Sequence, residues 1–195
     1  MLAVLPEPTA TIFATAAFTG LRRGEIRGMR WEDYADGEFR VTQSVWEGHV
    51  SAPKTFQSRG AVPIINSMAR MLEAHRMRCG NPASGPIFPA RNGKPLSMNN
   101  VLGRMILPAL KKAGLESLWH GWHAARRGLG SNLYALGIPE KTIQAILRHA
   151  NVRTTATYYI KTAPADATAA MAKLESAIPG LGNKQPESRL PVAIN

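Results

Sequence analysis

Apolar and small residues recur at helical spacing through much of this chain, and glycine or proline separates one patterned stretch from the next. Each stretch predicts a helix, because residues three and four positions apart share one helix face. Pro108 is expected to disturb one of these helices, and Pro139 stands where a helix begins. The predicted helices cover residues 8–18, 67–78, 97–112, 123–136 and 138–149.

Between the first two predicted helices the pattern changes to short β-prone runs. Residues 39–45 and 49–54 flank the sequence Trp-Glu-Gly, and residues 61–65 form a third run. These three runs predict a small antiparallel sheet, with Lys54 near a strand end or turn.

The length of 195 residues fits one domain with a sizeable core. Near the carboxyl end, residues 164–178 carry apolar positions at the spacing of a short amphipathic helix. The segment 179–195 has the composition of a flexible tail.

The charge is strongly positive, because 24 Lys and Arg residues oppose 13 acidic residues and leave a net charge of +11. Such an excess favours a polyanionic partner, with nucleic acid the leading candidate, although it also serves solubility alone. The single Cys79 excludes an internal disulfide framework and suits a reducing compartment, so we expect a cytoplasmic protein. Residues 9–19 are apolar but too few to span a bilayer, and no membrane association is expected.

The residues that carry chemistry are arranged for attack on a phosphodiester. Arg126 offers a planar charged fork for a phosphate, His123 shares its helix face, and Tyr158 supplies a hydroxyl that can become bonded to phosphorus. His120 and His123 have a spacing that zinc sites use, but no further ligand lies nearby in the sequence, so no metal and no other cofactor is expected.

Several motifs appear in one order along the chain. Residues 19–26 (TGLRRGEI) with 29–33 (MRWED) resemble the first arginine motif of the tyrosine recombinases, the phage integrase family. Residues 53–64 resemble that family's lysine hairpin, and His123 with Arg126 matches its histidine-x-x-arginine. Residues 147–152 resemble its third histidine motif, and 154–159 its nucleophile segment. The resemblance covers roughly residues 5–177.

The chain departs from the family pattern in a few places. Arg148 and Ala150 stand where many members carry Gly and Ser, and Ala125 stands where a larger apolar residue is common. The amino-terminal helical domain that members usually carry is not expected here. The resemblance therefore implies a catalytic domain over residues 1–178 without a core-binding domain, followed by the tail 179–195.

The resemblance implies an α+β fold, mainly α-helical, with a small three-stranded antiparallel sheet. It implies a site-specific DNA recombinase or integrase that cleaves and rejoins double-stranded DNA through a 3′-phosphotyrosyl intermediate, without metal or ATP. Two alternatives stay open. One is a DNA-relaxing enzyme with the same attack chemistry, like a type IB topoisomerase, and the other is a truncated DNA-binding or regulatory remnant.

The same resemblance assigns roles to single residues. Arg22 and Arg126 would stabilise charge on the phosphate, Tyr158 would be the nucleophile, with Tyr159 as its rival, and Glu25 would support the fold or orient Arg22. His123 would assist the tyrosine, Lys54 would protonate the leaving oxygen, and His149 would hydrogen-bond the phosphate. Residues 164–178 are expected to mediate self-association on DNA, with packing on their own core as the alternative. The candidates for contacts with the DNA backbone are Arg23, Arg59, Arg127 and Arg153.

Overall fold

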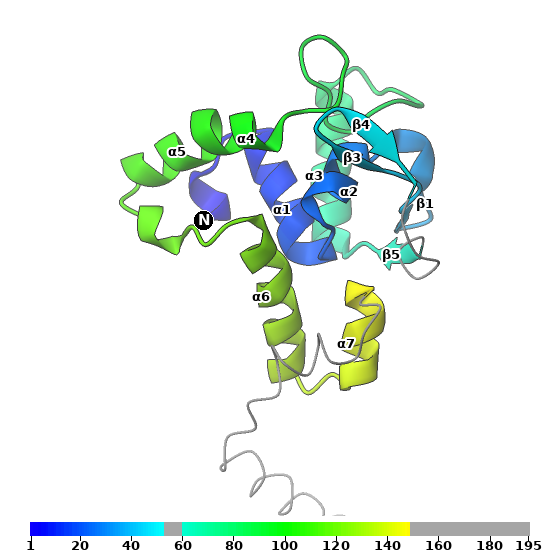
Figure 1. Cartoon of the computed structure of the whole chain (residues 1–195), viewed down its shortest axis with the longest axis vertical. Coiled ribbons are helices and arrows are strands. Elements are labelled where there is room, and N and C mark those ends of the chain that lie inside the picture. The colour runs from blue at the N-terminus through cyan, green and yellow to red at the C-terminus, as the bar shows by residue number, and fades with distance from the viewer. Residues whose placement is uncertain (53–59, 149–195) are drawn as a thin grey trace, which may run out of the picture. The chain divides into compact units, whose positions relative to one another are not determined.

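The computed structural model describes residues 1–52 and 60–148, and these residues belong to one compact unit (Figure 1). The helices are α1 (Thr9–Thr19), α2 (Arg23–Gly28), α3 (Asn66–Arg78), α4 (Met98–Val101), α5 (Leu107–Lys112), α6 (Trp122–Ala135) and α7 (Glu140–Leu147). Shorter helical turns are η1 (Leu2–Val4), η2 (Trp31–Asp33) and η5 (Glu116–Leu118), and η4 (Leu102–Ile106) is a π-helical segment. The expected fold class, mainly helical with a small antiparallel sheet, is confirmed.

The strands form two separate antiparallel sheets. The first has the order β1-β2-β5, and the second is the hairpin β3-β4. In the first sheet Phe39 of β2 lies between Tyr34 of β1 and Val62 of β5. The strand bounds are β1 (Tyr34–Ala35), β2 (Glu38–Arg40), β3 (Ser44–Trp46), β4 (His49–Ser51) and β5 (Ala61–Pro63).

The predicted composition of the three-stranded sheet was wrong in two respects. The sequence pattern missed β1, and the predicted strand 39–45 is two strands that belong to different sheets. Between these two strands, two side chains bond to residues outside the sheet. The Thr42 hydroxyl donates to a carboxylate oxygen of Asp33 at 2.8 Å, and the Gln43 amide donates to the Gly28 carbonyl at 3.0 Å. Residues 49–51 therefore pair with β3 and not with the three-stranded sheet.

Helix α1 is buried on nearly all sides and forms the centre of the core. It packs against α6, α3 and α2; in Figure 1, α2 and α3 lie to its right and α6 lies below it. Its four threonines are buried as fully as its aliphatic residues, and each hydroxyl has a partner. Thr15 donates to the Thr11 carbonyl at 2.8 Å and Thr19 to the Thr15 carbonyl at 2.5 Å, whereas Thr11 donates to Glu7 Oε2 at 2.7 Å and Thr9 to the Met105 sulfur at 3.3 Å. The sequence prediction for this helix is confirmed.

Helix α2 rests directly on the backbone that leads into the hairpin β3-β4. Gly24 and Gly28 are four residues apart and so share one face of the helix. A Cβ atom at position 28 would lie 2.7 Å from the Gln43 carbonyl oxygen, and one at position 24 would lie 3.3 Å from the carbonyl oxygen of Val45. The glycine face thus fixes the distance between the start of α2 and the hairpin whose second strand leads toward Lys54.

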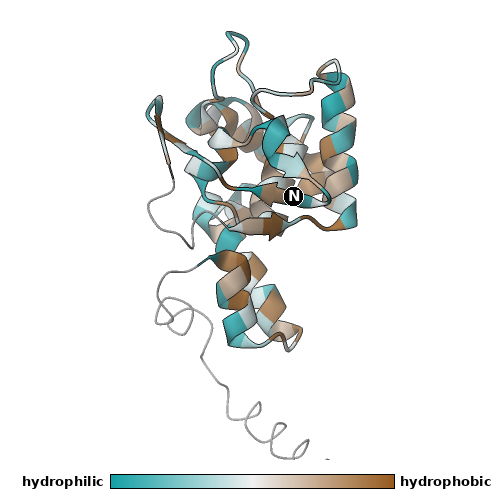
Figure 2. Cartoon of the chain, turned by 90° about the vertical axis from the view of Figure 1, so that its right-hand side faces the viewer, coloured by the Kyte–Doolittle hydropathy of each residue, from teal (hydrophilic) through white to brown (hydrophobic). Residues whose placement is uncertain are grey.

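Helices α6 and α7 pack as a pair with a small core of their own, formed by Ile143 and Leu147 of α7 against Leu129, Leu133 and Tyr134 of α6. Both helices carry hydrophobic and hydrophilic stretches in Figure 2. Gly20 ends α1 with a φ of +63°, and a Cβ at that position would lie 2.8 Å from a Leu147 methyl group. The end of α1 therefore approaches the end of α7 as closely as a glycine allows.

The predicted disturbance at Pro108 is present. Instead of one regular helix, α4 and α5 are joined by the π-helical segment η4, and Pro108 lies in the first turn of α5. A proline lacks the N–H that an α-helix would need there, and a wider turn accommodates that loss. The predicted helix 164–178 and the tail 179–195 lie outside the described residues. In the described ranges no helix is long and apolar enough to cross a membrane.

Candidate active site

The site begins at the amino-terminal end of α2, where Glu25 accepts two hydrogen bonds from Arg22. The Arg22 backbone N–H donates to Glu25 Oε2 at 2.8 Å, and the Arg22 guanidinium donates through Nη1 to Glu25 Oε1, also at 2.8 Å. A carboxylate in the first turn also interacts favourably with the exposed N–H groups of the helix. The Arg22 side chain keeps 39% of its surface exposed, whereas that of Glu25 keeps 5%.

Arg148 approaches the same carboxylate from the carboxyl end of α7. Its backbone is in the left-handed region with a φ of +51°, and its Nη2 donates to Glu25 Oε2 at 2.7 Å. The backbone carbonyl of Arg148 in turn accepts from Nη2 of Arg22 at 3.4 Å. Burial alone would raise the pKa of Glu25, but the guanidinium of Arg148 and the N–H and guanidinium of Arg22 outweigh burial and lower it. Glu25 is therefore a carboxylate shared by two arginines.

Arg126 lies on the buried side of α6, with 3% of its surface exposed. Its guanidinium donates through Nη1 to the Gly20 carbonyl and through Nη2 to the Leu147 carbonyl. Both acceptors lie close in the sequence to the other two arginines. Gly20 stands two residues before Arg22, and Leu147 stands directly before Arg148. Arg126 thus ties the start of α2, the middle of α6 and the end of α7 together.

His123 lies one helical turn before Arg126, on the exposed side of α6. Partial desolvation and the positive charges of Arg126, Arg127 and Arg22 lower its pKa below the ordinary value. The imidazole is therefore held toward its neutral form, which can accept a proton. Arg127 is exposed beside it.

Two further arginines of α2 connect it to its surroundings. Arg23, a predicted contact for the DNA backbone, donates to the Asn99 side chain at 3.1 Å and lies over the Trp46 ring of β3. Arg27, to which the sequence assigned no role, donates to the carbonyls of Leu96 at 2.9 Å and Val45 at 3.1 Å. Arg27 therefore fixes the same helix–hairpin arrangement as the glycine face.

The structure brings together four of the predicted site residues, namely Arg22, Glu25, His123 and Arg126. Of the other predicted residues, Arg23 and Arg127 lie in the described ranges, whereas Lys54, Arg59, His149, Arg153 and Tyr158 lie outside them. Sequence reasoning did not include Arg148, which it recorded only as a departure from the family pattern. The signal available in the sequence was that Arg148 stands directly before His149, which is itself a predicted site residue.

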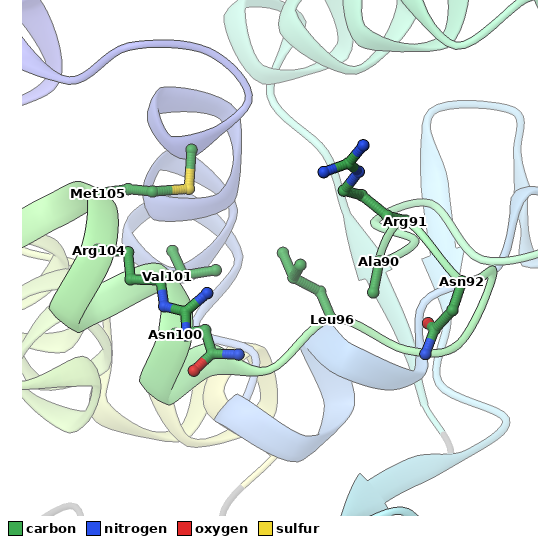
Figure 3. Close-up of a pocket in the computed structure, with 8 residues that line it drawn as sticks. All are labelled: Ala90, Arg91, Asn92, Leu96, Asn100, Val101, Arg104 and Met105. Carbon is green, nitrogen blue, oxygen red and sulfur yellow. The ribbon is translucent and has the colours of Figure 1, made fainter.

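Within the described ranges, no group of three or more His, Cys, Asp or Glu residues is arranged to hold a metal ion. A cavity of about 480 Å³ lies between α4, η4 and the loop before them. Figure 3 shows Leu96 between Val101 and Arg104 on one side and the Arg91 loop on the other. None of the residues that line it belongs to the predicted site.

The ends of α2 and α7, together with α6, carry three arginines on a small helical domain, and guanidinium groups suit the binding of phosphates. The sequence profile of the phage integrase family matches residues 3–165. The chain belongs to that family, and the resemblance inferred from its motifs is confirmed.

Relatives of known name support the same assignment. The chain is 28% identical over 190 residues to a tyrosine recombinase XerC-like protein of Caldanaerobacter subterraneus, which covers 84% of this chain and 48% of the relative. It is 30% identical over 143 residues to tyrosine recombinase XerC of Xylella fastidiosa, covering 72% of this chain and 44% of the relative. The chain thus spans about half the length of the curated relatives that it matches.

Solved structures show the same fold. The integrase of transposon Tn1549, in complex with circular intermediate DNA, superposes with a TM-score of 0.72 at 19% identity, over 89% of this chain and 63% of that chain. The XerA recombinase superposes with a TM-score of 0.63 at 19% identity, over 85% and 56% of the two chains.

Proposed function

We propose that this chain is the catalytic part of a site-specific DNA recombinase that cleaves and rejoins DNA strands through a 3′-phosphotyrosyl intermediate on Tyr158. The observation that carries the proposal is the cluster in which Glu25 orients the partly exposed Arg22 and two backbone carbonyls fix Arg126, with His123 one helical turn before Arg126. Membership of the phage integrase family supports it.

The cluster suits attack on a phosphodiester because that reaction builds negative charge on the non-bridging oxygens. Preorganised positive groups stabilise such charge without having to reorient during the reaction. Arg22 is half-exposed and its guanidinium is held by Glu25, so it can meet a phosphate from solvent. Arg126 adds a second fixed positive charge, whose position its contacts with two backbone carbonyls secure. His149 is assigned a hydrogen bond to the same phosphate.

The attack on phosphorus is accompanied by two proton transfers. Attack of the Tyr158 oxygen forms a bond to phosphorus while the bond to the 5′ oxygen of the next nucleotide breaks. Neutral His123 takes the phenol proton, and Lys54 gives a proton to the leaving 5′ oxygen. Because the phosphotyrosine keeps the energy of the broken bond, attack by a 5′ hydroxyl rejoins the strand without ATP. The two arginines supply the charge stabilisation that nucleases often obtain from metal ions.

The test is covalent trapping on a nicked suicide duplex built from the DNA that flanks the gene. The full chain and its Tyr158→Phe variant are incubated with this duplex, with and without EDTA, and the linked peptide is identified by mass spectrometry. We expect an adduct on Tyr158 of the unaltered chain, in equal yield with EDTA, and none with the variant. Tyr159→Phe is the matched control and should retain the adduct.

Other outcomes distinguish the alternatives. Equal capture by the unaltered chain and by Tyr158→Phe would contradict the proposal. Salt-sensitive DNA binding without any adduct would favour a regulatory remnant. Relaxation of supercoiled plasmid without recombinant product would favour a DNA-relaxing enzyme.

Double-stranded DNA is the proposed partner. Support comes from the positive net charge of +11 and from the Tn1549 integrase and lambda integrase structures, which contain DNA. Self-association on DNA is assigned to residues 164–178. Deleting them should weaken assembly on DNA, and unchanged assembly in sedimentation experiments would count against this role.

A further inference from the structure

Glu25 divides its two carboxylate oxygens between two arginines. Oε1 accepts from the guanidinium of Arg22, whereas Oε2 accepts from the guanidinium of Arg148 and from the Arg22 backbone. The Arg148–Glu25 pair is almost fully buried, with 3% and 5% of the two side chains exposed, and water does not screen it. Arg22, in contrast, keeps 39% of its side chain exposed.

This arrangement decides how much charge Arg22 can offer. One carboxylate facing Arg22 alone would neutralise it, and a neutral ion pair attracts a phosphate weakly. With Arg148 as the buried counter-charge, the three groups together carry a net charge of +1, and the exposed guanidinium is Arg22. Arg148 thus offsets Glu25 from the inside while Arg22 faces solvent.

Keeping Arg148 in this place has costs. Its backbone φ of +51° lies in the left-handed region, which residues other than glycine rarely adopt. Two of its buried nitrogens, Nε and Nη1, have no hydrogen-bond partner in the structure that is described. Burial lowers the pKa of Arg148, while the Glu25 carboxylate acts in the opposite direction. The ion pair with Glu25 is therefore the interaction that offsets these costs.

We propose that Arg148 is a positioning residue for DNA strand cleavage: it compensates the charge of Glu25, so that Glu25 can orient Arg22 without neutralising it. The inference rests on the proposed function, because it concerns how Arg22 binds the phosphate that Tyr158 attacks. It differs from a purely structural role in predicting that removing the charge of Glu25 repairs the loss of Arg148.

The test compares Arg148→Met, Arg148→Lys and the double variant Glu25→Gln/Arg148→Met in the full chain. The probe is a nicked duplex selected for binding to the unaltered chain from a random-sequence library. Single-turnover rates of covalent complex formation at saturating DNA are measured, together with DNA affinity by fluorescence anisotropy. The matched control is Arg78→Met, which removes one positive charge from the partly exposed pair of Arg78 with Glu7.

We expect Arg148→Met to lower the maximal rate by at least about tenfold, less than the loss of about 100-fold or more for removing a direct donor to the phosphate. Arg148→Lys should retain most of the rate, and the double variant should react several-fold faster than Arg148→Met. Arg78→Met should keep the maximal rate. Because Glu25→Gln also removes a buried carboxylate that has lost its partner, urea unfolding of both variants is measured beside the rates. A structural role alone predicts equal maximal rates per folded molecule for Arg148→Met and the double variant, and that result would overturn the proposal.

Two further results separate this inference from the proposed function. If the unaltered chain forms no adduct, the proposed function fails, and the role of Arg148 is then tested by DNA affinity. Weaker binding by Arg148→Met that Glu25→Gln restores supports this role, and equal affinities overturn it. If Arg148→Met does not fold, Arg148→Gly relieves the backbone strain and takes its place, with the double variant Glu25→Gln/Arg148→Gly beside it.

Discussion

Arg22 and Arg126 carry the same charge in opposite surroundings, and this difference separates their effects on activity and on stability. Replacing Arg22 with alanine should lower the rate of covalent trapping by about 100-fold or more, because it removes a donor to the phosphate. The free energy of unfolding should change by at most about 1 kcal/mol, since the ion pair of Arg22 is half exposed.

Arg126→Ala should instead destabilise the fold by about 2 kcal/mol or more, because it leaves the buried carbonyls of Gly20 and Leu147 without a donor. Urea unfolding and trapping rates on the same variants check both expectations, with Arg30→Ala as a surface control whose ion pair with Glu32 is exposed. Equal destabilisation by Arg22→Ala and Arg126→Ala would contradict the different burial of these side chains.

The histidine beside these arginines gives the reaction a pH dependence. Partial desolvation and the neighbouring positive charges lower the pKa of His123, so the ring stays neutral down to a pH below its ordinary value of about 6.5. The trapping rate should therefore hold as pH falls from 7.5 toward about 6.5 and decrease only below that value, where the ring becomes protonated. Arg127→Met removes one of the charges, and it should move the decrease to higher pH. A decrease that does not move would show that another group controls it.

The sequence motifs singled out candidate residues and the local contact of Glu25 with Arg22, but they did not predict the contacts between distant elements. Arg22 and His123 were identified by short patterns within single elements. The pairing of Arg148 with Glu25 joins residues 123 positions apart, and no local pattern encodes it. The carbonyl acceptors of Arg126 were equally beyond prediction, because any residue supplies a carbonyl and only the fold selects which one.

At the scale of elements, the glycine face of α2 should be sensitive to the smallest added side chain. Gly28→Ala places a methyl group 2.7 Å from the Gln43 carbonyl oxygen, and backbone cannot move aside as a flexible side chain can. We expect a loss of about 1–3 kcal/mol in the free energy of unfolding.

The matched control is Gly128→Ala in α6, where a Cβ would meet no atom within 4 Å. That change should raise stability by up to about 1 kcal/mol, because alanine favours a helix over glycine. Thermal and urea unfolding measure both variants. If Gly28→Ala and Gly128→Ala lower the free energy of unfolding equally, close packing of α2 on the hairpin does not explain the loss of stability.

The longer helices were predicted well because their patterns are long, and even the disturbance at Pro108 followed from the missing N–H of proline. Helix α2 was not among the predicted helices, because its six residues are too few to show a periodic pattern. The strands were predicted less well. A run of β-prone residues indicates extended chain, but it does not show where Thr42 and Gln43 turn the chain from one sheet to the other. Strand β1 has only two residues and is too short to leave a pattern.

For the whole molecule, the net charge of +11 should make DNA affinity strongly dependent on salt. Each phosphate neutralised by Lys or Arg releases counterions, so affinity should fall by about 100-fold or more between about 50 and 200 mM salt. Fluorescence anisotropy on one duplex at several salt concentrations measures the slope. A flat dependence would mean that contacts other than ionic ones hold the DNA.

The bonds that build the arginine cluster also connect distant parts of the chain: Arg126 reaches Gly20 across 106 positions, and Arg22 reaches Arg148 across 126. Contacts of such long range form only after the intervening chain has folded. During synthesis the first arginine is made early, and its partners on α6 and α7 are made late. A nascent chain that stops before Arg148 already carries Arg22, Glu25, His123 and Arg126, but it lacks the second arginine that pairs with Glu25. The complete cluster therefore forms only once the chain has been made through the end of α7.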